Sequence, residues 1–209
     1  MPNRTGLRER KRQRTHDAVS SIAIALFLEH GFDGVSVADI ASAAEISKPT
    51  LFRYFPSKED LVLHRFADHE GEAARVVRQR PARQTPLTAL RGHFLDGLAR
   101  RDPVTGLNDH PNVLAFHGMV FSTPSLSARL NDYVTRDEEA LAEALTPTPR
   151  IPDELTARLA AAQIIAVRRV LARDNWARLA AGATADAHYE TAKATAEHAF
   201  RLLSSGLGR

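Results

Sequence analysis

The sequence predicts an all-α protein in which a small N-terminal three-helix module is joined to a larger C-terminal helical bundle, with about nine helices in total. Alanine and leucine are plentiful, whereas aromatic residues make up only 6% of the 209 residues, which favours helix over strand. Apolar residues recur at helical spacing, and no convincing alternation of apolar and polar residues indicates a strand. Two short helical segments lie between Ser36 and Asp60, and the helical segments become longer after Asp60.

The composition is typical of a folded protein with a sizeable core, since 44% of the residues are hydrophobic and 25% are charged. The absence of cysteine excludes disulfides and thiolate metal sites. The best apolar runs, residues 22–28 and 159–167, are far shorter than a bilayer span, and no signal-peptide core directly follows the basic N-terminus. We therefore expect a cytoplasmic protein with no membrane partner.

The first helix is expected at about residues 15–30. Gly31 and Gly34 then end it in a turn. Before it, six basic residues and one acidic residue lie within the first fourteen positions. Such a run is either a solvated tail or an arm that follows phosphates or enters a minor groove. The apolar stripe of the helix consists of Val19, Ile22, Ala23, Leu26 and Phe27.

Two short helices follow, each with a serine suited to be its N-cap. Ser36 precedes one segment, which has Asp39 in its first turn. Ser47 precedes the other, which has Pro49 in its first turn, where a missing N–H costs little. Short helices are not stable alone, so they must share a core. We expect this core to contain Phe27, Ile40, Ile46, Leu51 and Phe55.

Longer helices are expected in the rest of the chain, separated mostly by segments that contain proline. No internal repeat is visible. The expected helices are at about residues 58–80, 87–100, 111–122, 125–145, 153–175 and 185–205.

The two short helices and the four-residue turn between them form a helix-turn-helix pattern. In this motif the second helix lies in the major groove of DNA, and its N-terminal residues meet base edges. Lys48 can donate to guanine or to a phosphate, and Thr50 can bond a base or a phosphate and contact a thymine methyl. Arg53 can reach the DNA backbone. The Ser57–Lys58 helix start offers N–H groups and a cation to an anion.

The run from Phe27 through Leu61 resembles the DNA-binding region of the TetR family of transcriptional regulators. The shared pattern is approximately F-x-x-x-G-[YF], then T-x-x-x-I-A-x-x-A-G-V-S-x-[GP]-T-[LI]-[YF]-x-[HY]-F-x-[SN]-K-x-x-L. The chain matches this pattern at Phe27, Gly31, Phe32, Ile40, Ala41, Ala44, Ile46, Ser47, Pro49, Thr50, Leu51, Phe52, Tyr54, Phe55, Ser57, Lys58 and Leu61.

The resemblance implies DNA contacts at particular positions. Residues 48–50 occupy the recognition-helix positions of the family. Tyr54 and Lys58 stand where family members commonly touch phosphates, and residues 36–37 lie at the start of the first reading helix, another frequent contact region. The expected DNA-binding residues are Ser36, Val37, Ser47, Lys48, Pro49, Thr50, Arg53, Tyr54 and Lys58.

Two residues depart from the family pattern. Glu45 replaces a common glycine in the turn, which costs roughly 1 kcal/mol if that position requires a positive φ. Phe52 replaces a frequent tyrosine, so a hydroxyl contact to phosphate is expected to be lost. Neither change removes the motif.

The resemblance also implies two domains. A helix-turn-helix DNA-binding domain is expected at residues 13–73, with the motif at about 36–55 and a basic arm at 1–14. An effector-binding and dimerisation domain is expected at residues 74–209.

In family members the last two long helices usually form a four-helix dimer interface. Here these would be residues 153–175 and 185–205. Residues 159–167 are apolar almost all round, as suits a helix buried on both sides. A stripe of mostly small residues on the last helix suits close helix approach, either across a dimer or within the core of one chain. That stripe consists of Tyr189, Ala192, Ala196, Ala199 and Leu203.

A ligand cavity is expected among the middle helices. Polar and aromatic groups near apolar sequence are its candidate lining, although such groups are more often plain core or satisfied surface residues. We expect no metal site, because His93, His110 and His117 lack HxxxH spacing and supporting carboxylates. The candidate ligand-binding residues are His93, Phe94, Phe116, His117, Met119, Phe121, Tyr133, Arg168 and Trp176.

No GxSxG, HExxH or P-loop motif is present, and no GxGxxG opens a helix after a strand, so we expect neither an enzyme nor a cofactor. The resemblance implies a ligand-responsive transcriptional regulator, most simply a repressor that binds a pseudo-palindromic operator as a dimer and is released by a small molecule. The expected partners are double-stranded DNA, a second copy of the chain and an unknown small-molecule effector. The alternative is a DNA-binding or helical scaffold protein without an effector.

Overall fold

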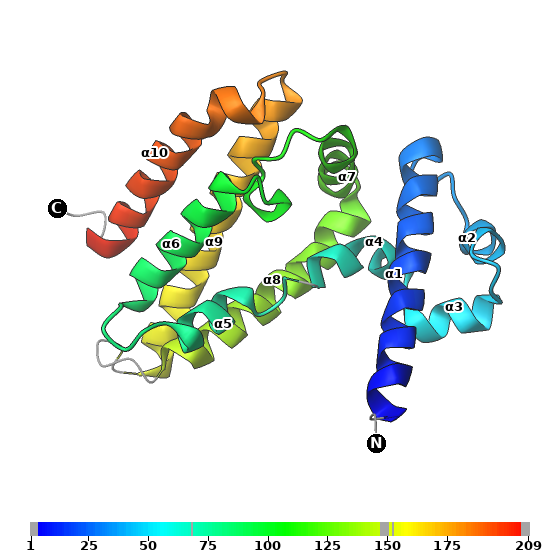
Figure 1. Cartoon of the computed structure of the whole chain (residues 1–209), viewed down its shortest axis with the longest axis horizontal. Coiled ribbons are helices and arrows are strands. Elements are labelled where there is room, and N and C mark those ends of the chain that lie inside the picture. Colours follow the sequence, from blue (N-terminus) through cyan, green and yellow to red (C-terminus); the bar gives the residue numbers. More distant parts are fainter. Residues whose placement is uncertain (1–3, 68, 147–150, 152, 206–209) are drawn as a thin grey trace. The chain divides into compact units, whose positions relative to one another are not determined.

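The computed structural model describes residues 4–67, 69–146, 151 and 153–205, with side chains in these ranges except at 4–9, 11 and 67. Within the described residues the chain forms ten α-helices and one short 3-10 helix, with no strand (Figure 1). The expected all-α class is therefore confirmed. No helix among the described residues is long and apolar enough to cross a membrane.

The chain divides into two compact units. Unit 1 comprises Met1–Asp68 and Ala115–Leu130, and unit 2 comprises His69–Leu114 and Asn131–Arg209. The helix α7 (Pro111–Ser122) lies mostly in unit 1, and most of α8 (Pro124–Leu145) lies in unit 2.

Unit 1 begins with four helices: α1 (Arg4–His30), α2 (Val37–Ala43), α3 (Lys48–Tyr54) and α4 (Lys58–Ala67). The helix α1 packs against α2 and α4, and α3 packs against α2 (Figure 1). Four of the five expected core residues are at most 1% exposed: Phe27, Ile40, Leu51 and Phe55. The expectation for Ile46 is wrong, because this residue lies in the turn between α2 and α3 and is only half-buried.

The helix α1 is longer than the sequence pattern indicates, since it starts at Arg4 rather than near residue 15. The added segment is rich in arginine, lysine and glutamine, which have high helix propensity even without an apolar stripe. The expected basic arm is thus helical from residue 4 onward, and Arg10, Arg12 and Arg14 are exposed on it.

The single helix expected at residues 58–80 is two helices, α4 and α5 (Glu72–Gln79). Gly71 immediately precedes α5 with φ of 70°, a left-handed conformation that interrupts a right-handed helix. The Gly71 backbone N–H donates to Asp137 Oδ1 at 2.7 Å, which holds the break against α8 within unit 2.

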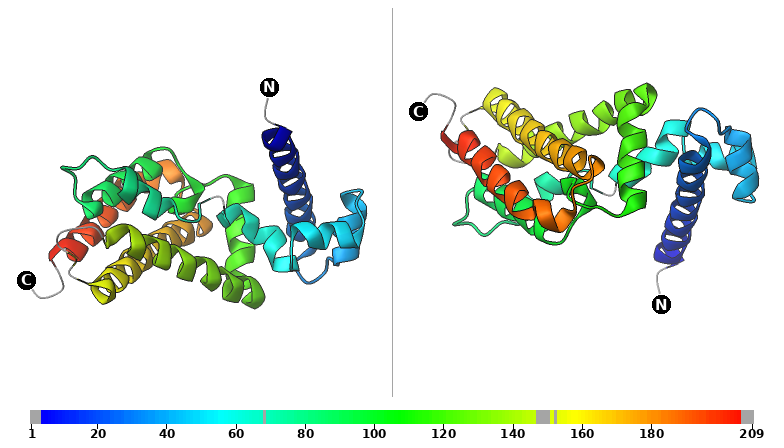
Figure 2. Two further views of the ribbon diagram at one scale, coloured as in Figure 1. Left: turned by 90° about the horizontal axis from the view of Figure 1, so that it is seen from below. Right: turned by 90° about the horizontal axis from the view of Figure 1, so that it is seen from above.

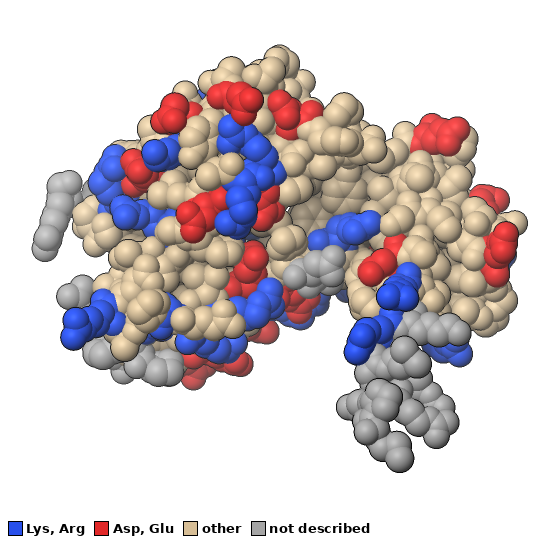
Figure 3. Space-filling view, viewed as in Figure 1, with Lys and Arg blue, Asp and Glu red and all other residues tan. Residues whose placement is uncertain are grey.

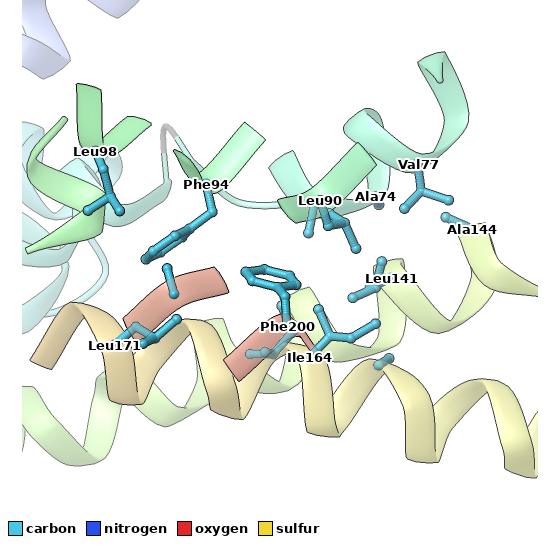
Figure 4. Close-up of a cluster of buried hydrophobic side chains, with 14 of the residues drawn as sticks. Ala74, Val77, Leu90, Phe94, Leu98, Leu141, Ala144, Ile164, Leu171 and Phe200 are labelled. Carbon is cyan, nitrogen blue, oxygen red and sulfur yellow. The ribbon is translucent and has the colours of Figure 1, made fainter. Parts of the chain in front are cut away.

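Unit 2 is completed by α6 (Pro86–Ala99), a short 3-10 helix (Pro103–Thr105), α9 (Glu154–Ala180) and α10 (Ala185–Ser205). The helix α10 packs against both α6 and α9 (Figure 2). Large apolar side chains from these helices meet in one cluster, in which the Phe94 and Phe200 ring centroids are 6.2 Å apart (Figure 4). Gly106 follows the 3-10 helix and lies so close to α9 that a Cβ there would be 1.9 Å from the Ala172 carbonyl oxygen.

The structure of a single chain bears on two expectations about the last helices. Ala192 and Ala196, from the small-residue stripe of α10, are at most 2% exposed inside the core of unit 2, so the stripe serves the internal core rather than a free face. The segment 159–167 is not buried on both sides within one chain, because Leu159 is 54% exposed while Ala161 and Ile165 are buried.

Candidate nucleic-acid interface

The start of α3 is fixed by its own side chains. Ser47 is the N-cap, and its Oγ accepts a hydrogen bond from the Thr50 backbone N–H at 3.2 Å. The Ser47 and Thr50 hydroxyl oxygens are 2.8 Å apart and share a second hydrogen bond. Pro49 occupies the first turn, where its fixed φ favours the helix and its missing N–H is not needed. The capping contacts that define the first turn therefore lie within the segment itself.

The two faces of α3 differ sharply in exposure. Leu51 is fully buried in the core of unit 1, whereas Ser47, Lys48 and Pro49 are exposed and Thr50 is half-buried. Phe52 is 46% exposed. From the sequence it was notable only for the hydroxyl group that a tyrosine would have, and its exposed ring was not predicted. Its position one helical turn after Lys48 could have identified it as part of the same face. The exposed side of α3 thus offers the cations Lys48 and Arg53, hydroxyl groups and an apolar ring.

The start of α2 carries a capping box. Ser36 accepts a hydrogen bond from the Asp39 N–H at 3.2 Å, and its own N–H donates to Asp39 Oδ2 at 2.8 Å. The Ser36 hydroxyl also donates to Asp39 Oδ2 at 2.6 Å. These hydrogen bonds hold the pKa of Asp39 below its usual range, so this carboxylate is ionised at neutral pH. Ser36 is exposed and Val37 is half-buried.

The turn between α2 and α3 requires a residue with positive φ. Glu45 has φ of 53°, its N–H donates to the Ser42 carbonyl oxygen at 3.1 Å, and the Ile46 N–H donates to the Ala41 carbonyl oxygen at 2.9 Å. This is the hydrogen-bond pattern that glycine commonly supports after a helix. A side chain in this conformation costs about 1 kcal/mol. The turn therefore does hold Glu45 at a positive φ, the conformation in which a residue other than glycine is strained.

Basic side chains gather beside the C-terminal end of α3. Arg12, Arg53 and Tyr54 line an open hollow of about 390 Å³. The Arg53 guanidinium carbon lies 5.7 Å from the centroid of the Tyr54 ring. Arg10, Arg12 and Arg14 on the described part of α1 are exposed, as is Arg53 on α3. Figure 3 shows several Lys and Arg side chains on this part of unit 1. Such a positive surface attracts phosphates.

Lys58 faces the interior of unit 1. Its Nζ donates to the Phe32 carbonyl oxygen at 2.5 Å and lies 4.4 Å from the centroid of the Phe32 ring. It also lies 5.4 Å from the Phe27 ring centroid. In the protein without DNA, this ammonium group therefore joins the start of α4 to the turn after α1.

The candidate ligand-binding residues are divided between the two units. In unit 2, His93 Nε2 and Arg168 Nη2 lie 3.6 Å and 3.9 Å from the Glu72 carboxylate. Burial lowers the pKa of His93, and a hydrogen bond from His69 holds the pKa of Glu72 below its usual value. These charges form a loosely paired, largely buried group.

The other candidates of unit 2 have separate surroundings. Phe94 belongs to the apolar core and contacts Phe200. Trp176 Nε1 donates to the Leu114 carbonyl oxygen at 3.2 Å. The Tyr133 ring lies 4.3 Å from the Arg136 guanidinium carbon.

The remaining candidates lie on the part of α7 that belongs to unit 1. The Phe116 ring centroid is 5.8 Å from that of Phe66, and the His117 centroid is 5.7 Å from that of Phe121. Met119 is half-buried on the same helix. Burial lowers the pKa of His117 to about 4. Among the described residues, His93, His110 and His117 do not form a metal-binding group with one another.

Comparison with known proteins identifies the same module. Residues 21–64 match the model for bacterial regulatory proteins of the tetR family. The chain is 34% identical over 183 residues to the HTH-type transcriptional regulator TcmR of Streptomyces glaucescens, an alignment that covers 85% of this chain and 80% of that protein.

Solved structures share the fold. NalD, the secondary repressor of the MexAB-OprM multidrug efflux pump in Pseudomonas aeruginosa, aligns with a TM-score of 0.60 and 20% identity over 90% of this chain and 96% of that chain. The transcriptional regulator FadR from Bacillus subtilis, solved in complex with stearoyl-CoA, aligns with a TM-score of 0.56 and 18% identity over 91% of this chain and 98% of that chain. With its helix-turn-helix geometry and its relation to TcmR, the chain belongs to the TetR family of DNA-binding transcriptional regulators.

Proposed function

We propose that the protein is a homodimeric repressor that binds a pseudo-palindromic operator and is released from it by a small molecule. The observation that carries this proposal is the division of α3 into a buried side, held by Leu51, and an exposed start at Ser47, Lys48 and Pro49. A helix held in this way can enter a major groove without rearrangement. Two copies would place two such helices in successive grooves.

Within the proposed interface, Lys48 and Thr50 read base edges, and Ser47 and Pro49 approach the groove beside them. Arg53 and Tyr54 hold phosphates at the hollow near Arg12. The exposed Phe52 adds an apolar contact, for which a thymine methyl is a suitable partner.

The remaining proposed contacts lie outside α3. At the start of α2, Ser36 and Val37 approach the DNA backbone. For Lys58 to reach a phosphate, its ammonium group must leave the Phe32 carbonyl oxygen. We assign residues 13–73 to DNA binding and 74–209 to effector binding and dimerisation. This role would place the protein in the bacterial cytoplasm and includes no catalytic step.

The proposed dimer forms through α9 and α10. Leu155, Leu159 and Val170 are between 54% and 67% exposed and share one face of α9, and Leu202 is 39% exposed on α10. Large apolar side chains exposed in this way are typical of a protein interface. This face, rather than the buried alanine stripe of α10, is the proposed contact with a second copy.

The proposed effector binds in unit 2. Its polar end would meet the Glu72, His93 and Arg168 group, in which His93 Nε2 and Arg168 Nη2 are 3.6 Å and 3.9 Å from the Glu72 carboxylate, beyond normal hydrogen-bond distance. A ligand that favours a dimer geometry with the wrong spacing of recognition helices weakens DNA binding, and such coupling is typically about 1–3 kcal/mol. The alternative is a DNA-binding protein of the same fold without an effector.

The direct test is a DNA-binding titration with the promoter upstream of the gene for this protein, at several salt concentrations. We expect salt-dependent binding, a changed base preference for Lys48→Gln and Thr50→Ala, and no change for Lys193→Gln, a matched loss of charge on α10. If the wild-type chain shows no salt-sensitive binding to this DNA, the repressor proposal fails.

A further inference from the structure

Two histidines and an aspartate from different helices meet in unit 1. His16 and Asp17 lie on α1 and His64 lies on α4. One possible ligand atom from each of the three lies within 4.8 Å of the other two. His64 Nε2 is 2.9 Å from Asp17 Oδ1, and the His64 side chain is 9% exposed. The proposed DNA contacts leave this group without a role.

The His16 ring has a buried nitrogen without a partner. Its Nδ1 makes no hydrogen bond, and the His16 and His64 ring centroids are 4.0 Å apart. In the neutral tautomer that carries its proton on Nε2, Nδ1 offers a lone pair to a cation. A buried polar nitrogen that stays unsatisfied is costly, and a metal ion would satisfy it.

We propose that His16, Asp17 and His64 together bind one divalent transition-metal ion, with Zn²⁺ as the representative case. Two imidazole nitrogens and a carboxylate oxygen form a ligand set that suits zinc and its neighbours in the first transition row. His64 Nε2 and Asp17 Oδ1 already lie 2.9 Å apart, so an imidazole nitrogen and a carboxylate oxygen face one another.

The geometry requires only small side-chain shifts. Ligands about 2.1 Å from a tetrahedral zinc ion lie about 3.4 Å from one another. His64 Nε2 and Asp17 Oδ1, now 2.9 Å apart, must move slightly apart, and the ion would replace the proton between them. Any two ligand atoms that are near 4.8 Å apart must move closer together. The Asp17 side chain is 46% exposed, which gives an ion a route from solvent and leaves room for water as a fourth ligand.

The surroundings limit the affinity. Arg12 and Arg65 are close enough to lower the pKa of His16 and of Asp17 respectively, so both also oppose a second cation. We therefore expect weaker binding than at a closed structural zinc site. A bound ion would connect α1 directly to α4. Ion binding should stabilise unit 1 against unfolding.

The test is calorimetric titration of ZnCl₂ into the full-length, tag-free chain after treatment with a chelator. We expect saturable binding of one ion per chain and a rise in the thermal unfolding temperature that a chelator reverses. Co²⁺ bound at the site should give the visible absorption bands of tetrahedral coordination. Because the chain has no cysteine, these bands cannot come from thiolate ligands. This experiment uses no DNA, so its result is independent of the proposed repressor function.

Three variants identify the ligands. His16→Gln, Asp17→Asn and His64→Gln should each weaken Zn²⁺ binding by about tenfold or more. His30→Gln, at an exposed histidine on the same helix, should bind as the wild type does. Asp17→Asn can keep a hydrogen bond to His64, so its fold should persist, and circular dichroism checks this. The proposal is overturned if the wild type binds no Zn²⁺ saturably, or if His16→Gln and folded Asp17→Asn bind it unchanged.

Discussion

The Lys58 ammonium group donates to the Phe32 carbonyl oxygen and lies 4.4 Å from the centroid of the Phe32 ring. Lys58→Met removes this charged donor while keeping an unbranched side chain of similar reach. We expect the free energy of unfolding to fall by about 1–2 kcal/mol, because a hydrogen bond and a cation–π contact are lost together. Urea unfolding followed by circular dichroism measures this change.

The matched control is Lys48→Met, which makes the same substitution at an exposed residue of α3. Its effect on stability should stay within about 0.5 kcal/mol. If Lys58→Met instead unfolds at the wild-type urea concentration and lowers the salt slope of DNA binding by about one, Lys58 acts on a phosphate and its contact with Phe32 contributes little.

Glu45→Gly should stabilise the protein by about 0.5 kcal/mol. Glycine removes the side-chain strain at φ of 53°, and this gain exceeds the extra conformational freedom of glycine in the unfolded chain. Thermal or urea unfolding reports the change. Glu45→Ala is the control, because it removes the carboxylate but keeps the strain. Equal stabilisation by both variants would show that charge, not backbone conformation, is the cause.

His117 should make the protein less stable as the pH falls below about 6.5. Its folded-state pKa is about 4 because it is buried, so between these values the unfolded chain binds a proton that the folded chain does not. The free energy of unfolding should fall by about 3 kcal/mol across this window and lose no more from this group below pH 4. At pH 7 the effect is absent.

His117→Met places an apolar, non-titrating side chain among Phe66, Phe116 and Phe121. It therefore removes the pH-dependent contribution of His117 to stability. Urea unfolding at pH 4.5 and pH 7 should show a smaller difference for this variant than for the wild type. His198→Gln, at an exposed histidine on α10, should leave the wild-type difference intact. An unchanged pH dependence in His117→Met would contradict the assignment.

Leu159→Glu should convert the proposed dimer into a monomer at micromolar concentration. The substitution introduces a charge into the exposed apolar face of α9, where a second copy would bury it without a partner. Sedimentation velocity measures the mass in solution. Ala128→Glu makes the same charge change at an exposed position of α8 and should leave the mass unaltered. A wild-type monomer at this concentration would exclude the dimer model.

The α3 region was predictable because its signals are local. Ser47 and Pro49 define the start of the helix within three residues. Leu51 and Phe55 are four residues apart, so they lie on the same side of the helix, and both are buried. Strain at Glu45 was predicted only from comparison with the glycine that is common at this position in the family. The buried core of unit 1 followed from these residues, with Ile46 as the exception.

Other features depend on contacts that no local pattern contains. The apolar spacing through residues 58–80 suits one helix, and only the conformation of Gly71 and its hydrogen bond to Asp137 show two. The alanines of α10 have the same spacing whether they face a second copy or their own core. His64 lies 47 residues from Asp17, so no sequence motif brings their hydrogen bond into view.

The hydroxyl groups at the start of α3 are occupied by capping, while Lys48 and Phe52 are exposed. Positions 47 and 51 therefore tolerate little change, because they maintain the fold. Positions 48 and 52 can vary with little cost in stability. Duplicated copies of such a gene could thus diverge in operator preference by substitutions at these two positions, while the rest of the domain is inherited unchanged.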